Sequence, residues 1–409
     1  MRDGYRRKLA VLVAVLATIG LAPAAQAGIR PAARFSSLCG AMDGTHPATI
    51  SHVMFIVMEN RSYSTVVGSK KAPYLNNTLI PGCGLATNYH NYSHPSTPNY
   101  LALTSGKAQG RGASADCLPS GCPQSQESIF TQLGTAGQAW REYAEAMPGN
   151  CRKTDYDNTS YVNADGSTGE EYYVRHAPPP YYTSVPVPGK CKKWDVPLGT
   201  TSSGALLTAL SPASDGLPAF SFVTPGGCDD MHDCGTTTGD DWLRNWIPVI
   251  QQSAAYQSGQ LVVFLTWDEG EGADKTNGET CWDATHADSS AYPSCHIATI
   301  VMSPYTTPGT TPGDYFNHLS LLGTAEDLLG LPRLPATQGM TGLESAFGLR
   351  APASGVRRAP ERRGITEWNR TFANGIQHSP RITPVCTYLV NLAALPGVSH
   401  VAGITRQRS

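Results

Sequence analysis

Beyond its first 27 residues, this chain of 409 residues has no apolar run long enough to cross a membrane, which takes about 20 residues in a helix. The first 27 residues combine a basic start at 6–8 with an apolar stretch at 9–21 and a final Ala-Gln-Ala. This order is typical of a secretory signal peptide cleaved before Gly28. We therefore expect a secreted protein that makes no stable insertion into a membrane.

The sequence also lacks an excess of positive charge, because 30 Lys and Arg residues stand against 32 Asp and Glu residues. Arginines are concentrated in residues 351–409, which leaves the segment 28–350 acidic. An acidic body argues against a nucleic-acid partner, and it suits a site in which carboxylates surround a cation. Surface solubility alone would explain the same charge equally well.

None of the 11 cysteines forms a CxxC pair, and this argues against a metal site of the cysteine type. In an exported chain, this many cysteines predicts disulfide bonds. Close or moderate spacing suggests Cys117 with Cys122, Cys151 with Cys191, Cys228 with Cys234, Cys281 with Cys295 and Cys39 with Cys83, which leaves Cys386 over.

Apolar runs rich in β-branched residues predict buried strands at 52–59, 219–225, 260–269 and 298–304. The hydrophobicity of these runs is nearly continuous rather than alternating. That pattern indicates strands whose two faces are both covered by other elements.

Helical patterns occur between and after these runs, at 128–133, 240–256 and 318–329. Alternating strands and helices predict an α/β protein built as a three-layer α/β/α sandwich. The Gly-, Pro- and Cys-rich stretches 107–125 and 150–200 are expected to be loops held by disulfide bonds.

The chain is long enough for one large domain or two ordinary ones, and it contains no internal repeat. After Gly348 the sequence becomes rich in Pro and Arg, with little periodicity. We therefore expect one domain at 28–350, followed by a tail at 351–409 that lacks the composition of a folded unit.

Two of the predicted strands end in acidic and amide residues that can ligate a cation. Glu59 and Asn60 follow the first strand, and Asp268 and Glu269 follow the third. Ligands bind at the carboxyl ends of strands in open α/β sheets, so we expect these side chains to converge on one site. Oxygen ligands of this kind suit Mg²⁺, Ca²⁺ or Mn²⁺, or Zn²⁺ or Fe when histidine takes part. Acidic residues that merely cap helices are the simpler reading of either pair alone.

An Asp-rich segment, GGCDDMHDCG at 226–235, follows the second strand. Asp229, Asp230, His232 and Asp233 could ligate a metal ion or supply a general acid, and an Asp-rich turn is an equally good interpretation. His318, at the predicted start of a later helix, has the same ambiguity between a cap or surface residue and a functional one.

The motif Ser96-Thr97-Pro98-Asn99 stands at the expected start of a helix. A serine at this place often only accepts hydrogen bonds from the first turn. Free N–H groups at a helix start also stabilise phosphate oxygens, and a nearby cation lowers the pKa of a hydroxyl. Ser96 is therefore also a candidate nucleophile for attack on phosphorus, activated without a Ser-His-Asp triad.

A set of segments, in this order along the chain, carries a family resemblance: MEN at 58–60, NYHNYSHPSTPNYLALTSG at 88–106, WDE at 267–269, VMSP at 301–304 and NHLSLLGTAEDLLGLP at 317–332. Together they resemble the bacterial phosphoesterase family, which includes acid phosphatases and non-specific phospholipases C. That family belongs to the alkaline-phosphatase-like superfamily. The resemblance extends from about residue 50 to residue 348.

The resemblance implies an alkaline-phosphatase-like fold and a hydrolase that acts on phosphoric esters. It assigns Glu59 and Asn60 to a metal-binding pair, Ser96 to the nucleophile, and Asp268 with Glu269 to an acidic pair. The acid phosphatase branch has Asp-Asp at that last place, whereas this chain has Asp-Glu, as phospholipase C relatives tend to have. The difference weakens any transfer of the identity of the metal.

The resemblance also provides candidates for contact with the phosphate. His232 and His318 match positions that could bind it or protonate the leaving group, and Asn99 could donate hydrogen bonds to its non-bridging oxygens. His94 and His176 are candidates too, with a structural role equally well supported. The resulting hypothesis is attack by Ser96 on a phosphate ester beside a divalent metal ion, followed by hydrolysis of the phosphoserine.

Three alternatives differ in testable ways. A phospholipase C would release diacylglycerol from a phospholipid head group and would need apolar loops at the mouth of the site, which the segment 172–187 could supply. A sulfatase usually needs a C/S-x-P-x-R motif, and here Pro98 is followed by Asn99. A secreted binding protein on the same fold would lack ligands, and none of the core positions is missing.

Overall fold

The computed structural model describes residues 39–42, 50–185, 190–211, 216–271 and 295–349. All of them belong to one unit, which spans residues 1–354. The expected signal peptide, residues 1–27, and the expected tail, residues 351–409, lie outside the described ranges. No helix among the described residues is long and apolar enough to span a membrane.

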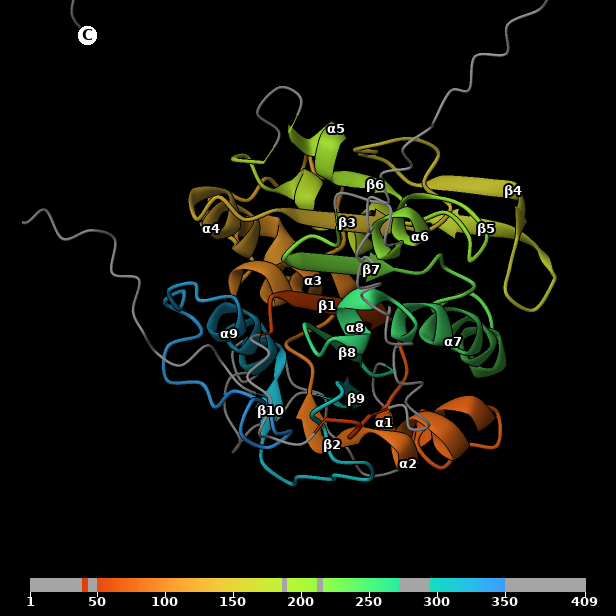
Figure 1. Ribbon diagram of the computed structural model, residues 1–409. Helices are drawn as coiled ribbons and strands as arrows, with labels where there is room; N and C mark the ends of the chain where they lie inside the picture. Colours follow the sequence, from red (N-terminus) through yellow and green to blue (C-terminus); the bar gives the residue numbers. More distant parts are fainter. Residues whose placement is uncertain (1–38, 43–49, 186–189, 212–215, 272–294, 350–409) are drawn as a thin grey trace, which may run out of the picture. The chain divides into compact units, whose positions relative to one another are not determined.

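A central sheet of eight strands, in the order β10-β2-β9-β8-β1-β7-β3-β6, forms the middle of the described part of the chain (Figure 1). All neighbours are parallel except β9, which runs antiparallel to both β2 and β8. The strands are β1 His52–Met58, β2 Gly84–His90, β3 Trp140–Ala144, β6 Asp195–Pro197, β7 Phe220–Thr224, β8 Leu261–Trp267, β9 His296–Met302 and β10 Phe316–Asn317, and a separate antiparallel hairpin pairs β4 Tyr156–Val162 with β5 Thr168–Tyr172.

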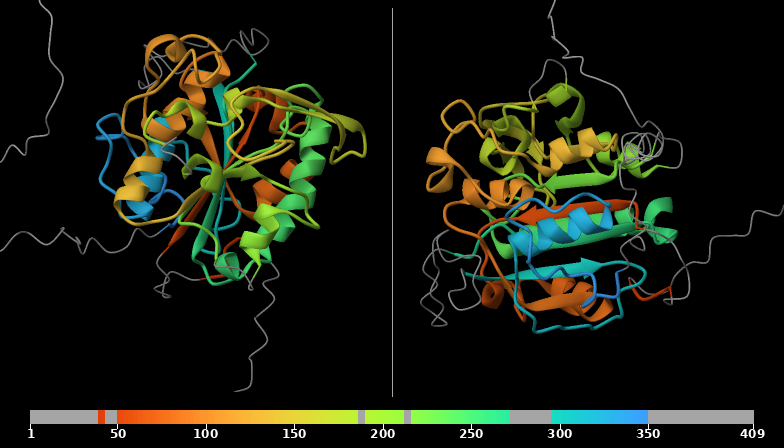
Figure 2. Two further views of the ribbon diagram at one scale, coloured as in Figure 1. Left: turned by 90° about the horizontal axis from the view of Figure 1, so that it is seen from above. Right: turned by 90° about the vertical axis from the view of Figure 1, so that its left-hand side faces the viewer.

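Helices cover both faces of this sheet, which confirms the predicted three-layer α/β/α sandwich (Figure 2). α3 and α9 lie on one face, and α7 lies on the other. The α-helices are α1 Tyr63–Val66, α2 Ile80–Gly82, α3 Ser96–Ser105, α4 Ile129–Thr135, α5 Lys190–Trp194, α6 Ala205–Leu210, α7 Thr236–Gln251, α8 Ala254–Gln257 and α9 His318–Leu328. Shorter turns are the π-helical η1 Leu75–Leu79 and the 3₁₀ turns η2 Gly110–Ala113, η3 Val174–His176 and η4 Pro179–Tyr181.

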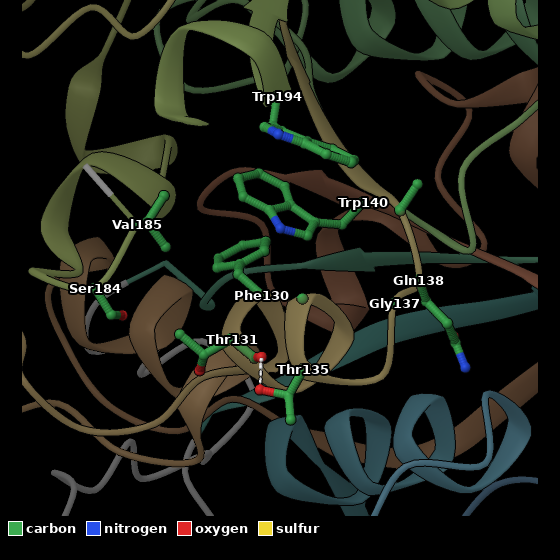
Figure 3. A pocket seen from close by; sticks show the side chains of 11 residues that line it. Phe130, Thr131, Thr135, Gly137, Gln138, Trp140, Ser184, Val185 and Trp194 are labelled. Carbon is green, nitrogen blue, oxygen red and sulfur yellow. Dashed lines mark hydrogen bonds between the residues drawn. The ribbon is translucent and has the colours of Figure 1, made fainter. Parts of the chain in front are cut away.

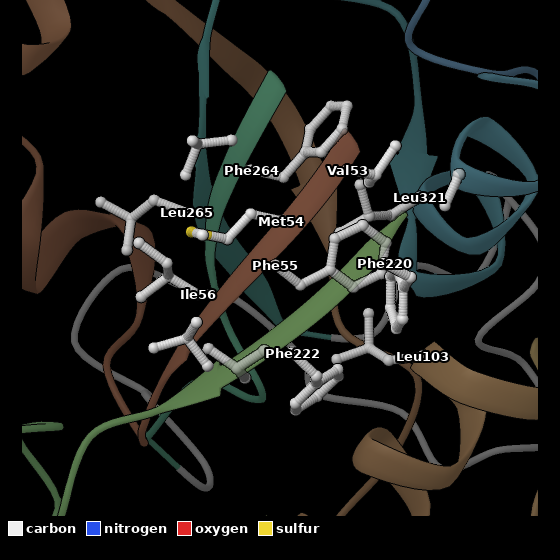
Figure 4. Close-up of a cluster of buried hydrophobic side chains, with 14 of the residues drawn as sticks. Val53, Met54, Phe55, Ile56, Leu103, Phe220, Phe222, Phe264, Leu265 and Leu321 are labelled. Carbon is white, nitrogen blue, oxygen red and sulfur yellow. The ribbon is translucent and has the colours of Figure 1, made fainter. Parts of the chain in front are cut away.

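A row of aromatic side chains forms the core under α3 and α9 (Figure 4). Phe55 of β1 is in register with Phe222 of β7 and Phe264 of β8, so the three side chains lie side by side on one face of the sheet. The Phe55 ring meets Phe264 edge to face with centroids 5.9 Å apart, an arrangement that aromatic quadrupoles favour. All three residues are fully buried. Successive residues along β1, β7 and β8 are buried too, which confirms that these apolar runs are strands covered on both faces.

The stretch 150–200 is more structured than the sequence suggested. Instead of loop alone, it contains β4, β5, α5, β6 and the turns η3 and η4. β4 is largely exposed, so it lacks the buried apolar pattern by which the other strands were recognised, and β6 is only three residues long.

Four of the expected disulfide bonds are present, namely Cys39–Cys83, Cys117–Cys122, Cys151–Cys191 and Cys228–Cys234. Cys295 is also disulfide-bonded, but its expected partner Cys281 lies outside the described residues, as does Cys386.

Candidate active site

Three neighbouring strand ends provide most of the candidate site. β8, β1 and β7 are adjacent in the sheet, and Asp268, Glu59 and the disulfide loop 228–234 follow them. The Glu59 N–H donates to the carbonyl of Asp230 at 2.9 Å. The Asn60 N–H donates to Asp268 Oδ1 at 3.2 Å. Asn60 has a φ of 44°, a left-handed conformation that asparagine tolerates better than most residues.

Ser96 is the first residue of α3, and it is 2% exposed. Its hydroxyl donates to Glu59 Oε2 at 3.1 Å, and the N-cap position of the helix is occupied by Pro95. The neighbouring Thr97 hydroxyl instead donates to Asp116 Oδ1 at 2.9 Å. The structure therefore places Ser96, and not Thr97, against the candidate metal ligands.

The start of α3 offers fewer free N–H groups than the sequence suggested. The Thr97 N–H is taken by Asp116 Oδ1 at 2.9 Å, and residue 98 is a proline, which has no N–H. The expectation that free amides of the first turn would receive the phosphate oxygens is therefore wrong for these two positions.

The two oxygens of Glu59 face different partners. Oε2 faces Ser96, whereas Oε1 accepts a hydrogen bond from the Tyr100 hydroxyl at 2.5 Å and lies 3.2 Å from His176 Nε2. His176 Nδ1 in turn lies 3.2 Å from Asp230 Oδ2. One donor atom from each of Glu59, His176 and Asp230 can be chosen so that all three lie within 4.8 Å of one another, which is a spacing that could hold a metal ion.

His176 and Asp230 were only weakly indicated by the sequence. His176 was one of several candidate histidines, and Asp230 was one of several acidic residues in the disulfide loop 228–234. The signals that could have singled them out are the histidine before a Pro-Pro-Pro run and the position of the Asp-rich segment at a strand end. By contrast, the Asp229 carboxylate turns away from the site and accepts from Ala164 N at 3.0 Å.

The site concentrates negative charge in a buried place. Burial, and then the fields of Asp268 and Asp230, raise the pKa of Glu59 well above its ordinary value. Burial, and then Glu269, raise the pKa of Asp268 to about 8. Burial is also the first cause that raises the pKa of Glu269. Buried carboxylates at this density need protons or a cation to offset their repulsion.

The polar atoms of the site fit a hard divalent cation. Asp268 Oδ2, Asp230 Oδ2 and His176 Nε2 are buried and lack a well-formed hydrogen bond to the described residues, although the last two atoms take part in the 3.2 Å contacts given above. One end of the Asn60 amide lies 3.1 Å from Glu269 Oε1 and 3.2 Å from Glu59 Oε2. With nitrogen at that end, the amide donates to both carboxylates; with oxygen there, it joins them as a third oxygen ligand, as Mg²⁺ or Ca²⁺ would require.

Asn99 supports the site and does not face a substrate. Its Oδ1 accepts from the N–H groups of Tyr92 and Ser93 at 3.0 and 2.8 Å, and its Nδ2 donates to Glu269 Oε2 at 3.1 Å. Because Asn99 is fully buried, the suggested contact with phosphate oxygens does not agree with its placement. His94 Nδ1 approaches the same Glu269 oxygen at 2.7 Å.

The two histidines proposed as catalytic lie in different places. His318, the first residue of α9, is fully buried. Its Nε2 contacts the backbone carbonyl of Asp268 at 2.6 Å, and its Nδ1 contacts the Tyr89 hydroxyl at 3.1 Å. With both ring nitrogens occupied, His318 holds Asp268 rather than reaching a leaving group. His232 is partly exposed, and its Nδ1 pairs with Asp233 at 2.6 Å. Its ring centroid lies 5.8 Å from that of His176, so it is near the acidic centre and accessible to solvent.

A cavity of about 510 Å³ opens elsewhere, at the start of β3 (Figure 3). Phe130, Trp140 and Trp194 line it, and the two indole rings stack with centroids 5.6 Å apart. Trp140 is the first residue of β3, whereas the candidate catalytic groups follow the last residues of their strands. None of the predicted site residues lines this cavity, so it is separate from the candidate active site.

The chain is similar to known phosphoesterases. The model of the Phosphoesterase family matches residues 70–332. Phosphatidylinositol-3-phosphatase of Mycobacterium tuberculosis is 28% identical over 286 residues, which cover 70% of this chain and 79% of that protein. An acid phosphatase of Aspergillus fumigatus is 26% identical over 279 residues, and the match covers 68% of this chain but about half, 54%, of that enzyme.

Among solved structures, a protein in the alkaline phosphatase superfamily from Vibrio parahaemolyticus matches 75% of this chain and 71% of its own, with a TM-score of 0.43 and 11% identity.

Proposed function

The chain belongs to the Phosphoesterase family, and on that premise we propose that it is a secreted, metal-dependent phosphatase that forms a phosphoserine at Ser96. The curated relatives named above are phosphatases, which supports hydrolysis of phosphoric ester bonds. Secretion is proposed from the signal-peptide pattern of residues 1–27.

The hydrogen bond from Ser96 to Glu59 carries the proposal. It brings the Ser96 hydroxyl, at the start of α3, against a buried acidic strand end, whereas the Thr97 hydroxyl donates to Asp116. A serine nucleophile needs a means of losing its proton, and the Ser96 hydroxyl already donates to the Glu59 carboxylate.

A divalent cation held by Glu59, Asn60, Asp268 and Glu269 would neutralise the phosphate charge and lower the pKa of the Ser96 hydroxyl. His176 and Asp230 adjoin this set through Glu59 Oε1. The donors include oxygen atoms and a histidine nitrogen, a set that suits Mg²⁺, Ca²⁺, Mn²⁺, Zn²⁺ or Fe.

Side chains of the protein account for each bond that forms or breaks in the proposed hydrolysis. Ser96 Oγ attacks phosphorus in line as its proton passes toward Glu59 Oε2, and the bond from phosphorus to the leaving oxygen breaks. His232, partly exposed at the mouth, gives a proton to the leaving alcohol. Water next attacks the phosphoserine and gives a proton to His232, while the bond from phosphorus to Ser96 Oγ breaks and the proton held by Glu59 returns to Ser96. Inorganic phosphate is released and the starting groups are restored.

The substrate is proposed to be a phosphate ester of a small molecule or of a lipid head group. The mycobacterial relative is named for a phosphate monoester on a phosphoinositide, so a monoesterase can act on a lipid without being a phospholipase C. Two assays decide between these activities: release of p-nitrophenol from p-nitrophenyl phosphate, and release of phosphocholine from phosphatidylcholine vesicles. We expect the first reaction to be much faster; phosphocholine release as the dominant reaction would overturn the assignment to phosphatases.

A further inference from the structure

A phosphate monoester presents more negative charge than the groups assigned so far can receive. A dianionic monoester has three non-bridging oxygens, and a bound cation contacts only some of them. Thr97 N–H and the Asn99 amide are committed to Asp116 and Glu269, and His318 is buried behind Asp268. The site therefore needs a further positively charged donor.

Arg175 occupies a suitable place, in the turn η3 directly before His176. Its Nη2 lies 3.4 Å from His232 Nε2, and its guanidinium carbon lies 3.7 Å from the centre of the Tyr173 ring. Stacking on an aromatic face holds the planar guanidinium while it leaves the N–H groups at its edge available.

The charge of Arg175 acts on the acidic centre. Burial lowers the pKa of Arg175, but the fields of Glu59 and then Asp116 outweigh burial and raise it. Arg175 in turn is among the groups that lower the pKa of Glu269. The guanidinium is thus electrostatically coupled to both the Ser96-bonded carboxylate and the Asp-Glu pair.

The guanidinium is not consumed by a salt bridge. Its nearest carboxylate contact among the described residues is Asp116 Oδ2, which lies 3.9 Å from Nε and so beyond hydrogen-bond distance. The side chain of Arg175 is 18% exposed, so a ligand at the mouth can reach it. An arginine that is fixed by stacking beside a candidate catalytic centre, and that has further edge N–H groups besides the one facing His232, is well suited to bind a phosphate oxygen.

We propose that Arg175 binds a non-bridging phosphate oxygen and makes the site selective for monoesters over diesters, an inference that rests on the proposed function. The physical reason is charge. A monoester dianion offers three charged oxygens, and Arg175 receives the one that the cation does not. A diester carries a single charge, and an alkoxy group replaces that third oxygen, so a guanidinium there finds a weaker acceptor.

The test uses two substrates with one leaving group, p-nitrophenyl phosphate and methyl p-nitrophenyl phosphate. For Arg175→Ala, we expect kcat/KM for the monoester to fall about 10²-fold, the usual loss for one charged donor to a transition state, and kcat/KM for the methyl diester to change by less than about threefold. Arg175→Lys keeps the positive charge but lacks the planar guanidinium with its paired N–H donors. This variant should recover part of the activity that Arg175→Ala loses on the monoester. Arg244→Ala, on the exposed part of α7, is the matched control and should behave as wild type.

Binding of inorganic phosphate, measured by calorimetry on the metal-loaded protein, gives a readout that does not depend on turnover. Arg175→Ala should weaken this binding about tenfold or more, with the bound metal content unchanged. Equal losses for both substrates, or unchanged phosphate binding, would overturn the assignment of Arg175. If the wild-type protein hydrolysed neither ester, the proposed function on which this inference rests would be wrong.

Discussion

Ser96 Oγ donates a hydrogen bond to Glu59 Oε2 at 3.1 Å, although the two residues are 37 positions apart in the sequence. Ser96 is the first residue of α3 and Pro95 is its N-cap, so the Ser96 side chain does not stand at the position from which a serine caps a helix. Its hydroxyl contacts the carboxylate at a buried strand end instead. This relationship motivates the assignment of Ser96 as the nucleophile.

The first prediction separates the two hydroxyls of the Ser-Thr-Pro-Asn motif. Ser96→Ala should lower kcat on p-nitrophenyl phosphate by at least about 10³-fold, because the nucleophile is lost. Thr97→Val should keep activity within about threefold, because the Thr97 hydroxyl faces Asp116 and not Glu59. Retention of most of the metal-dependent activity by Ser96→Ala would rule out the phosphoserine scheme.

Removal of metal should affect both activity and stability. Four buried carboxylates with raised pKa surround the site, so a chelator should abolish turnover and lower Tm, since loss of a ligand specific to the native state destabilises it. Asp268→Asn should reduce the bound metal measured by elemental analysis. If EDTA left both turnover and Tm unchanged, a metal-free site or a binding protein would become the better account.

Arg61 is expected to position the disulfide loop 228–234. Its Nη2 donates to two carbonyl oxygens of that loop at 2.6 and 3.0 Å, and the loop carries Asp230 and His232. Arg61→Met should lower kcat/KM about 10- to 100-fold, the usual effect of losing a group that orients a metal or catalytic residue. Arg152→Met is the control: it also loses hydrogen bonds to carbonyl groups, but on an exposed segment, and it should leave kcat/KM unchanged. Equal effects of the two substitutions on kcat/KM would argue against a positioning role for Arg61.

Stability should fall with rising pH because of a buried pair of carboxyl groups that is not part of the candidate site. Glu142 on β3 and Asp195 on β6 are register partners and fully buried. Burial raises the pKa of Asp195 to about 8, and burial with the field of Asp195 raises that of Glu142. Since each folded pKa exceeds the unfolded one, the folded state binds more protons. The contribution of Asp195 to stability is complete below about pH 4 and is lost as pH rises through about 8, and that of Glu142 is lost in the same direction.

Replacement of the pair by Glu142→Gln and Asp195→Asn should flatten this decline. The difference in slope between the two proteins should approach about 1.4 kcal/mol per pH unit for each carboxyl removed, measured by urea unfolding from about pH 5 to 8. Asp157→Asn, at an exposed position, serves as the control and should follow wild type. Parallel curves for wild type and the double variant would show that the pair is not the cause.

Much of the fold and part of the site follow from the sequence. The buried runs of β1, β7, β8 and β9 are recognisable because they are continuously apolar, and the ends of β1 and β8 carry the acidic pairs that meet. β2, β3 and β6 carry polar or charged residues and lack that signal. The antiparallel direction of β9 depends on a long connection, and nothing in the local pattern encodes it.

The site residues that the sequence indicated only weakly were missed for one reason. His176 and Arg175 lie in a single 3₁₀ turn inside the long connection 150–200, where no periodicity indicates which side chains return to the sheet. His318 and Asn99 were overestimated for the opposite reason: their motifs are specific, but burial and hydrogen bonding to Asp268 and Glu269 give them supporting roles. The sequence motifs identified which segments form the candidate site. Only the tertiary contacts distinguish the residues that can contact a ligand from the residues that support them.

The central claim is most directly tested by trapping the covalent intermediate. Wild-type protein with a divalent metal would be mixed with p-nitrophenyl phosphate, quenched in acid from the first turnover through steady state, and digested for mass spectrometry of the peptide that carries Ser96 and Thr97. Phosphate on Ser96, absent from Thr97 and from the Ser96→Ala protein, is the result predicted here. Phosphate on another side chain, or turnover with no phosphorylated residue at any time point, would contradict it.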